Sequence, residues 1–229
     1  MREKIERELA PRLIVAASTV TLPARVAATA RRAAGRRGRL ELYFGFDDPA
    51  SAYAVIDLAR RLEGRSVIFD LRAVARRGIE GDPALERKRA YAITDARRLA
   101  RRLGLTLLRT EPVDPQTTAF LAAWVDGAPR GSALTQFTIA AMTQLWFEST
   151  GEVTAEPYER IWRRCFGSAP PAAGDPASIN AVRAAEKQMS RRGPYETPAA
   201  WVAGRWFFAQ DRPQQIADWL DQLGWSVER

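Results

Sequence analysis

The residues best suited to chemistry lie at the start of a predicted helix, in the run Asp48-Pro49-Ala50-Ser51. Aspartate is a favoured N-cap residue and proline a favoured first helical residue, so the run indicates where the helix begins. A carboxylate at this point is kept ionised by the helix dipole. Asp48 can then act as a base, or as the partner of a cationic or hydroxyl-bearing ligand. The alternative is that Asp48 only caps the helix, which contributes about 1 kcal/mol to stability.

The chain has 229 residues and no histidine, which excludes several kinds of catalytic site. A Ser–His triad, a Cys–His nucleophile and a histidine-containing zinc or copper site are all impossible. Acid–base chemistry must come from Asp, Glu, Lys, Tyr or Cys, and we expect no metal. The single cysteine, Cys165, cannot form an intramolecular disulfide. It lies between Trp162 and Phe166, so we expect a buried apolar residue with no part in activity.

The elements that must position these residues follow a simple order. Residues 40–44 and 66–71 have strand character and flank a helix that ends near Leu62, which makes a right-handed βαβ unit with a parallel sheet. The next part of the chain is mostly helical, with helices predicted at residues 86–103, 117–125, 135–149, 156–166 and 179–189. Two short strands, at 199–202 and 205–208, flank a turn at Gly204 and precede a final amphipathic helix. Periodicity alone therefore predicts an α/β protein with a helical subdomain.

The N-terminal residues 1–38 are expected to form a separate, basic piece. Ile5, Leu9 and Leu13 have helical spacing, and six arginines but no acid occur between Arg25 and Arg39. We expect a helix and a solvated linker that docks loosely on the body; the alternative is an arm that touches anionic surfaces. The remaining boundaries are predicted at residues 39–76 for the first α/β half, 77–192 for the helical block and 193–229 for the second half.

The net charge of +8 does not by itself indicate a nucleic-acid partner. The basic residues are nearly all arginine and are spread along the chain, as on solvated helix faces, so we expect no nucleic acid to bind. The sequence contains no apolar run long enough to span a membrane and no clear secretion signal. The interpretation at this point is a cytoplasmic protein.

Three stretches together resemble the DsbA-like thioredoxin-fold family, which includes the 2-hydroxychromene-2-carboxylate isomerases and the kappa-class glutathione transferases. The first is Tyr-Phe-Gly-Phe-Asp-Asp-Pro-Ala-Ser-Ala-Tyr-Ala at residues 43–54, and the second lies at residues 87–105. The third and most specific, residues 193–212, ends in Gln210-Asp211-Arg212. The resemblance covers about residues 40–223. It implies an α/β, thioredoxin-like fold (βαβ…ββα) with an all-helical insertion between its two halves.

The resemblance also implies a glutathione site in the second half. A cis proline faces the active-site helix in this family, which implies a cis Thr197–Pro198 bond; a simple strand-edge proline is the alternative. The backbone of Thr197 would pair with the cysteinyl part of glutathione like an added strand. Asp211, in the turn formed with Gln210 and Arg212, would hold the γ-glutamyl end at the start of the last helix. The alternative for Asp211 is a helix N-cap beside a solvated Arg212.

Other residues of the resembling stretches are open to two interpretations. Lys88 either contacts an anion in the cleft or is solvated. Tyr91 is interpreted as a core residue rather than a catalytic one. Trp201 and Trp206 flank the cleft strands and can wall an aromatic substrate pocket, although most of the tryptophans are expected to serve packing.

The chain departs from the family at the reactive positions, where relatives carry a serine before the proline or a Cys-Pro-x-Cys motif. Asp48 and Ser51 stand there instead and are the candidate catalytic residues. Without cysteine at either position, thiol–disulfide exchange is excluded. A carboxylate would also repel a bound thiolate by several kcal/mol at about 4 Å and low effective dielectric.

The function implied is a glutathione-dependent isomerase or transferase-like enzyme of the 2-hydroxychromene-2-carboxylate isomerase group. Its substrate would be a hydrophobic, aromatic or conjugated small molecule, and relatives suggest a homodimer. Two alternatives stay open. One is a catalytically degenerate thioredoxin-fold binding or scaffold protein, and the other is a glutathione-independent enzyme that uses Asp48 itself.

Overall fold

The first half of the fold is the predicted βαβ unit. The computed structural model describes residues 21–75, 82–172 and 174–227. Strand β1 (Gly38–Phe44) leads through a short loop into helix α3 (Pro49–Leu62), which returns the chain to strand β2 (Val67–Ala73). The two strands are parallel, with residues 38–44 opposite residues 67–73. Helix α3 begins where the sequence indicates, because Asp48 caps it and Pro49 has the φ angle that a first helical residue requires.

The second half adds two antiparallel strands and a helix. Strands β3 (Ala199–Val202) and β4 (Arg205–Phe208) form a hairpin that is followed by helix α9 (Pro213–Gln222). The sheet order is β2-β1-β3-β4, with β3 antiparallel to both β1 and β4. The hairpin turn uses Gly204 at a φ of 88°, a left-handed conformation that favours glycine. This is the thioredoxin-like βαβ…ββα order, as predicted.

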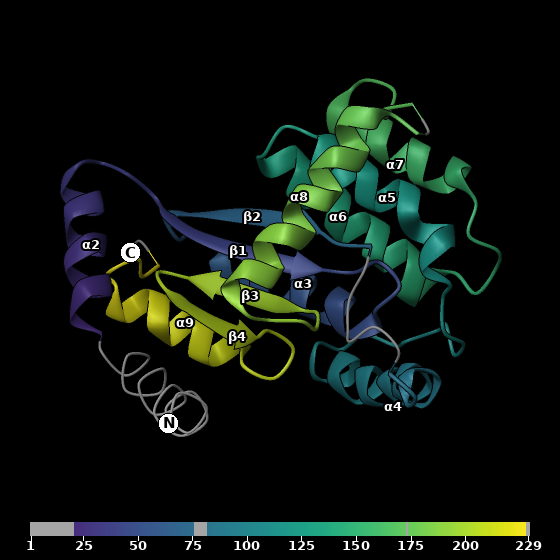
Figure 1. The fold of residues 1–229 in the computed structure, drawn as a ribbon, viewed down its shortest axis with the longest axis horizontal. Helices are drawn as coiled ribbons and strands as arrows, with labels where there is room; N and C mark the ends of the chain where they lie inside the picture. The colour runs from purple at the N-terminus through teal and green to yellow at the C-terminus, as the bar shows by residue number, and fades with distance from the viewer. Residues whose placement is uncertain (1–20, 76–81, 173, 228–229) are drawn as a thin grey trace, which may run out of the picture.

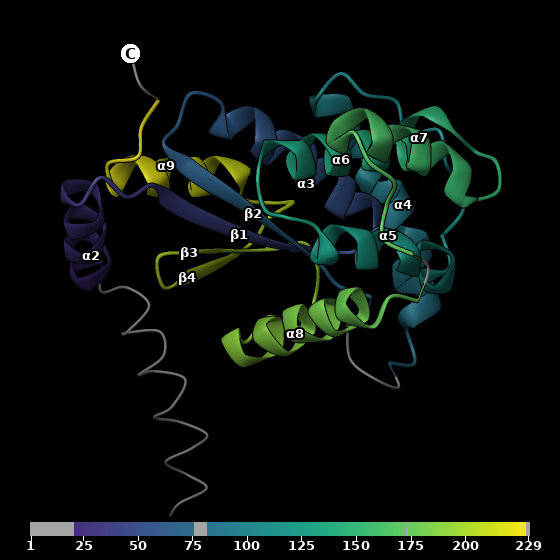
Figure 2. The same ribbon diagram turned by 90° about the horizontal axis from the view of Figure 1, so that it is seen from above.

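A block of helices separates the two halves, drawn in teal and green in Figure 1. In chain order it comprises α4 (Leu85–Arg102), α5 (Pro115–Gly127), α6 (Ser132–Thr143), the π-helical turn η1 (Gln144–Glu148), α7 (Ala155–Phe166) and α8 (Pro176–Arg192). Figure 2 shows α5, α6 and α7 gathered at one end of the sheet, α8 along one face, and α9 on the opposite side. The predicted helical insertion is therefore present, and its last helix doubles as a cover for the sheet.

The structure adds detail to two of the predicted segments. The helix expected at 135–149 is α6 followed by η1, so its last turn has π rather than α spacing. A helix and a solvated linker are expected within residues 1–38, and the structure has a helix there, α2 (Leu22–Ala33), inside the arginine run. It buries Ala28, and Arg25 Nη2 donates to Gln222 Oε1 of α9 over 3.3 Å. Its alanine content favours a helix, a signal that the arginine run concealed. The spacing at Ile5, Leu9 and Leu13 lies outside the described residues.

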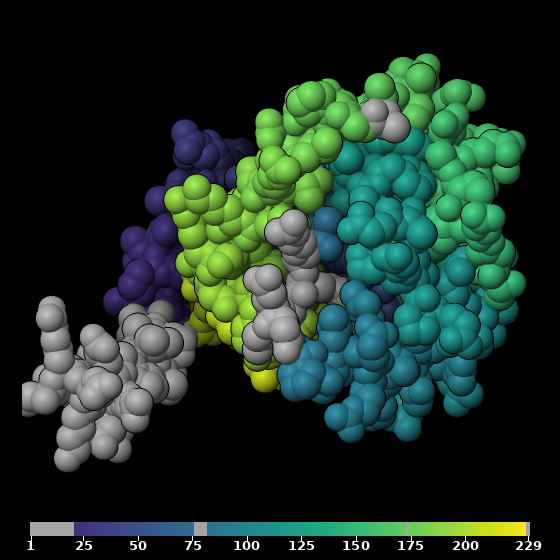
Figure 3. All heavy atoms as spheres, turned by 45° about the vertical axis from the view of Figure 1, so that its right-hand side comes forward, coloured from purple at the N-terminus to yellow at the C-terminus, as the bar shows by residue number. Residues whose placement is uncertain are grey.

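In the space-filling view, the purple helix α2 and the teal to green helices α4–α7 lie at opposite ends of the molecule (Figure 3). Within the described residues, no helix has the length and apolar character needed to cross a membrane.

Strand β1 is the central element that positions the candidate site, since its carboxyl end leads directly into the loop before Asp48. Leu40, Leu42 and Phe44 point into the main apolar core and are fully buried. Glu41 and Tyr43 alternate with them and are also buried, on the face that α8 covers. Arg192 of α8 neutralises this face: its Nη2 donates to Glu41 Oε1 over 3.2 Å and its Nη1 to the Tyr43 hydroxyl over 3.3 Å. Both faces of β1 are thus fixed by packing or by paired charge.

Candidate functional site

Asp48 lies at the centre of a small hydrogen-bonded cluster at the start of α3. Its Oδ1 accepts from the Ala50 backbone N–H over 3.2 Å, which is the helix cap expected from the sequence. Its Oδ2 accepts from the Ser51 hydroxyl over 2.6 Å and from the Thr197 hydroxyl over 3.2 Å. The side chain is only 2% exposed. Asp48 is therefore both a cap and a carboxylate that receives donors from both halves of the fold, which stabilises its charge.

The Ser51 hydroxyl makes its hydrogen bonds within this cluster. Its side chain is fully buried, and besides donating to Asp48 its Oγ accepts from the Gly45 backbone N–H over 3.2 Å. The hydroxyl thus ties the loop after β1 to the first turn of α3. Because the proton of Ser51 already points at Asp48, its chemical role in this arrangement is to orient the carboxylate.

The Thr197–Pro198 peptide bond is cis, the geometry that the family resemblance implies. Thr197 is buried beside Asp48, and the Pro198 carbonyl accepts from the Ala209 backbone N–H over 2.9 Å. That backbone bond joins the residue before β3 to the residue after β4. The Thr197 hydroxyl, which donates to Asp48, holds the proline loop against the start of α3.

A cleft of about 500 Å³ opens beside this cluster. It is bounded by the start of α3, the first half of α4, the loop before β3 and the end of β4. The lining residues are Asp48, Ala50, Leu85, Arg87, Lys88, Arg89, Tyr91, Ala92, Asp95, Glu196, Thr197, Phe208 and Gln210. The structure thus brings Asp48, Thr197, Gln210 and Lys88 to one cleft.

Lys88 and Gln210 are two polar residues of this lining, and they differ in whether they already have a partner. Lys88 lies in the cleft but pairs with Asp82, with 2.5 Å between Nζ and Oδ2, and this contact raises the pKa of Lys88. Gln210 carries a buried Oε1 that accepts no hydrogen bond from any described residue. A buried acceptor without a donor is unfavourable, so the Gln210 amide is a point at which a ligand donor would be stabilised.

Asp211 and Arg212 do not reach this cleft. They line a separate hollow of about 300 Å³, together with Tyr53, Asp57 and Arg61 of α3 and the beginning of α9. The alternative of an Asp211 N-cap is also wrong, because the N-cap position of α9 is Arg212 and no side chain caps the helix. The Gln210–Arg212 turn therefore divides its side chains between two hollows.

The aromatic wall of the cleft differs from the expectation. Phe208 and Tyr91 line it, whereas Trp201 and Trp206 do not. Trp201 lies under the Arg192 guanidinium, 4.7 Å from its ring centroid. Tyr91 is 61% exposed, so its interpretation as a core residue is wrong. The signal that could have found it is its position three residues after Lys88, because residues three or four apart share one helix face.

Cys165 is partly buried against the apolar core, and burial raises the pKa of its thiol. A thiol in that state is a poor nucleophile. We therefore expect Cys165→Ala to leave glutathione binding, and any turnover, within about threefold of the unmodified protein. Calorimetry on both proteins checks this, and a larger loss with an unchanged melting temperature would place chemistry at Cys165. No group of three or more metal-ligating side chains occurs among the described residues.

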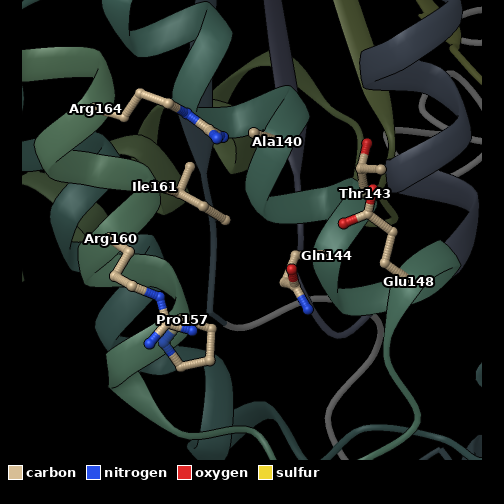
Figure 4. Close-up of a pocket in the computed structure, with 8 residues that line it drawn as sticks. All are labelled: Ala140, Thr143, Gln144, Glu148, Pro157, Arg160, Ile161 and Arg164. Carbon is tan, nitrogen blue, oxygen red and sulfur yellow. The ribbon is translucent and has the colours of Figure 1, made fainter.

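A further hollow of about 470 Å³ lies inside the insertion. Figure 4 shows that it separates α6 and η1 from α7, with Gln144 and Glu148 on one side and Arg160 and Arg164 on the other. None of the predicted site residues lines it.

A four-stranded sheet in this order, a capped helix facing a cis proline and a helical insertion define a DsbA-like thioredoxin fold. Solved structures with this fold include 2-hydroxychromene-2-carboxylate isomerase, with a TM-score of 0.62 and 13% identity, covering 81% of this chain and 96% of that one. A probable DsbA oxidoreductase from Streptomyces coelicolor has a TM-score of 0.59 and 15% identity, with 84% and 93% covered. The cytosolic disulfide reductase DsbM from Pseudomonas aeruginosa has a TM-score of 0.51 and 15% identity, with 81% and 97% covered. No protein-family model and no curated protein matches the chain.

Similarity at these identities shows the fold, and the reactive positions of this chain are its own. Asp48 and Ser51 stand at the start of α3, and the single cysteine of the chain, Cys165, lies in α7, so no disulfide can form at this helix start. What the arrangement offers chemically is a fixed carboxylate beside a cleft with aromatic walls, cationic side chains and one unsatisfied amide oxygen.

Proposed function

We propose that this protein acts on an aromatic or conjugated small molecule in the cleft, at a thiol-independent site centred on Asp48. The observation that carries this proposal is the Asp48 carboxylate, which accepts from the helix backbone, Ser51 and Thr197 at once. These are the donors that would otherwise be available to a bound thiolate. Because the carboxylate already occupies them with a negative charge, a thiolate there would be repelled.

The lining of the cleft supports a ligand with an unsaturated body and a polar edge. Tyr91 and Phe208 supply aromatic surface, and the Gln210 amide supplies an acceptor for an N–H or O–H group. The lining carries both signs of charge, with Arg87, Lys88 and Arg89 on the α4 wall and Asp48, Asp95 and Glu196 around it, so a polar edge of either sign finds a partner. An enzyme with these groups would use Asp48 to accept a hydrogen bond or a proton from the substrate.

A second candidate, a glutathione-dependent isomerase or transferase-like enzyme, is favoured by the Thr197–Pro198 loop, which faces Asp48, and by the fold shared with 2-hydroxychromene-2-carboxylate isomerase. In this case the Thr197 backbone would bind glutathione. Asp211 and Arg212 line the other hollow, so Gln210 and Lys88, which line the cleft, would supply the remaining contacts to glutathione. We also propose a homodimer and a cytoplasmic location.

Titration of glutathione into the Asp48→Ser variant tests both candidates. We expect the unmodified protein to bind glutathione weakly, and the variant to bind at least about tenfold more tightly, because a like charge is removed while serine still caps the helix. Calorimetry measures the affinity and a thermal melt measures stability. Asp114→Ser is the matched control, since Asp114 also precedes a proline and caps a helix, α5, through the Gln116 backbone N–H. Asp114→Ser should lower the melting temperature by roughly 2–4 °C, and Asp48→Ser by more, because the buried Ser51 and Thr197 hydroxyls also lose their acceptor.

Three outcomes separate the candidates. Tight binding by the unmodified protein that weakens in Asp48→Ser would refute thiol exclusion and support the glutathione-dependent enzyme. Equal, weak binding by both proteins, with retained binding of an aromatic probe such as anilinonaphthalene sulfonate, would mean that repulsion by Asp48 is not what excludes glutathione. If neither glutathione nor the aromatic probe binds either protein, the cap is a remnant in a scaffold without a small-molecule site.

A further inference from the structure

The turn η1 is the one described element of the insertion with π-helical spacing. Such turns widen the helix by one residue, are uncommon, and occur frequently at functional sites. The residues of η1 divide between two environments. Gln144 and Glu148 line the hollow towards α7, whereas Leu145, Trp146 and Phe147 are buried.

Trp146 reaches from this turn to the loop that carries Asp48. Its side chain is fully buried, and its indole Nε1–H donates to the Phe46 carbonyl oxygen over 3.0 Å. Phe46 stands two residues before Asp48 and is itself buried, with its ring edge-on to Phe44. The hydrogen bond therefore joins residues 100 positions apart in the chain, at the point where β1 ends.

The main chain of the same turn is bonded to the segment that follows α4. The Trp146 carbonyl accepts from the Leu108 backbone N–H over 3.0 Å and from the Arg109 N–H over 3.4 Å. Arg109 Nε also donates to the Leu145 carbonyl over 3.0 Å. Since α4 forms a wall of the cleft, η1 contacts both the loop before Asp48 and the segment that leads out of that wall.

We propose that Trp146 is a positioning residue for the candidate site, holding the 45–48 loop so that Asp48 faces Ser51 and Thr197. This inference rests on the proposed role of Asp48. The physical reason is that the Phe46 carbonyl is buried: without the indole N–H it has no replacement donor from water, and the loop moves to find one. The same turn is held at its main chain, because the Leu145 and Trp146 carbonyls accept from residues 108 and 109.

Hydrogen exchange of the backbone amides in residues 45–52 tests the proposal without any ligand. In Trp146→Phe we expect these amides to exchange about tenfold faster relative to the rest of the protein. The matched control is Trp162→Phe. Trp162 is also buried in the insertion, stacked on Phe166 at 4.1 Å between ring centroids, but its indole N–H has no acceptor among the described residues. The control should lower stability without a selective effect on residues 45–52.

Replacement of Trp146 by 3-benzothienylalanine removes only the N–H and keeps the ring shape, so it serves where Trp146→Phe fails to fold. Faster exchange confined to residues 45–52 supports the proposal. Exchange that rises uniformly, or that matches the Trp162→Phe control, would overturn it. Because the measurement needs neither glutathione nor an aromatic ligand, a failure here is distinct from a failure of the proposed function.

Discussion

Replacing Arg130 by methionine is expected to lower the free energy of unfolding by roughly 3–5 kcal/mol, the largest effect among the substitutions considered for this chain. Arg130 Nη2 donates to Asp126 Oδ1 over 2.8 Å, and its Nε lies 3.5 Å from Asp70 Oδ1. The side chains of Asp126 and Asp70 are 0% and 2% exposed. Its Nη1 also donates to the Leu71 carbonyl over 2.6 Å. Removing the cation leaves buried carboxylates short of a partner, and methionine cannot satisfy them.

Arg130 connects the sheet, which carries the candidate site, to the helical insertion. Asp70 and Leu71 belong to β2, whereas Asp126 belongs to α5, so one side chain bonds the sheet to the helical insertion. Arg39 and Arg72 also contact Asp70, which keeps part of the charge compensated when Arg130 is lost. We therefore expect a destabilised but folded protein whose insertion is less firmly attached.

Urea unfolding of the two proteins measures the loss. Arg160→Met is the matched control, because Arg160 also pairs with an acid one helical turn away, with 2.6 Å between Nη1 and Glu156 Oε1, but is 65% exposed. An exposed pair of this kind contributes about 0.3–0.5 kcal/mol. Equal losses in the two variants would show that burial does not make the Arg130 cluster important.

The fold could be predicted where its signals are local. Strands at 199–202 and 205–208 agree with the structure residue for residue, because aromatic residues and Gly204 specify a hairpin within ten positions. The π spacing of η1 could not be predicted in this way. The Trp146 carbonyl accepts from the backbone of residues 108 and 109, and its indole N–H donates to Phe46, so this turn depends on partners far away in the sequence.

In the candidate site, too, the residues set by local sequence could be predicted, and those set by distant contacts could not. Asp48 and Ser51 follow from the start of α3, and the family resemblance placed Thr197 opposite them, where the structure has it. The separation of Gln210 from Asp211 did not follow, because the backbone angles of the turn after β4 decide into which hollow each side chain points. The Arg130 cluster was also missed, since its members come from β2, α5 and the residues after α5.

Asp126 gives this cluster a dependence on pH. Burial raises the pKa of its carboxyl to about 7, although the hydrogen bond and the charge of Arg130 act in the opposite direction. Arg72 also lowers this pKa, and Asp70 raises it. Its Oδ2 accepts no hydrogen bond from any described residue, in keeping with a group that gains little from being ionised. In the unfolded chain the same carboxyl titrates near its ordinary pKa of about 4.

The native protein therefore binds a proton at Asp126 between pH 4 and pH 7, where the unfolded chain does not. By linkage, the stability contributed by this group is fully present below about pH 4 and is lost as pH rises through about 7. The unfolding free energy of the unmodified protein, minus that of Asp126→Asn, should thus fall by at most about 4 kcal/mol from pH 4 to pH 8. Asparagine is neutral throughout, so subtraction removes the contributions of all other groups.

Urea unfolding at five pH values measures the difference. By the same argument, Arg130→Met should lose less stability at pH 5 than at pH 8, because a protonated Asp126 no longer needs the cation. A difference that stays flat, or that rises with pH, would mean that Arg130 keeps Asp126 ionised in the native protein and that burial is the weaker effect.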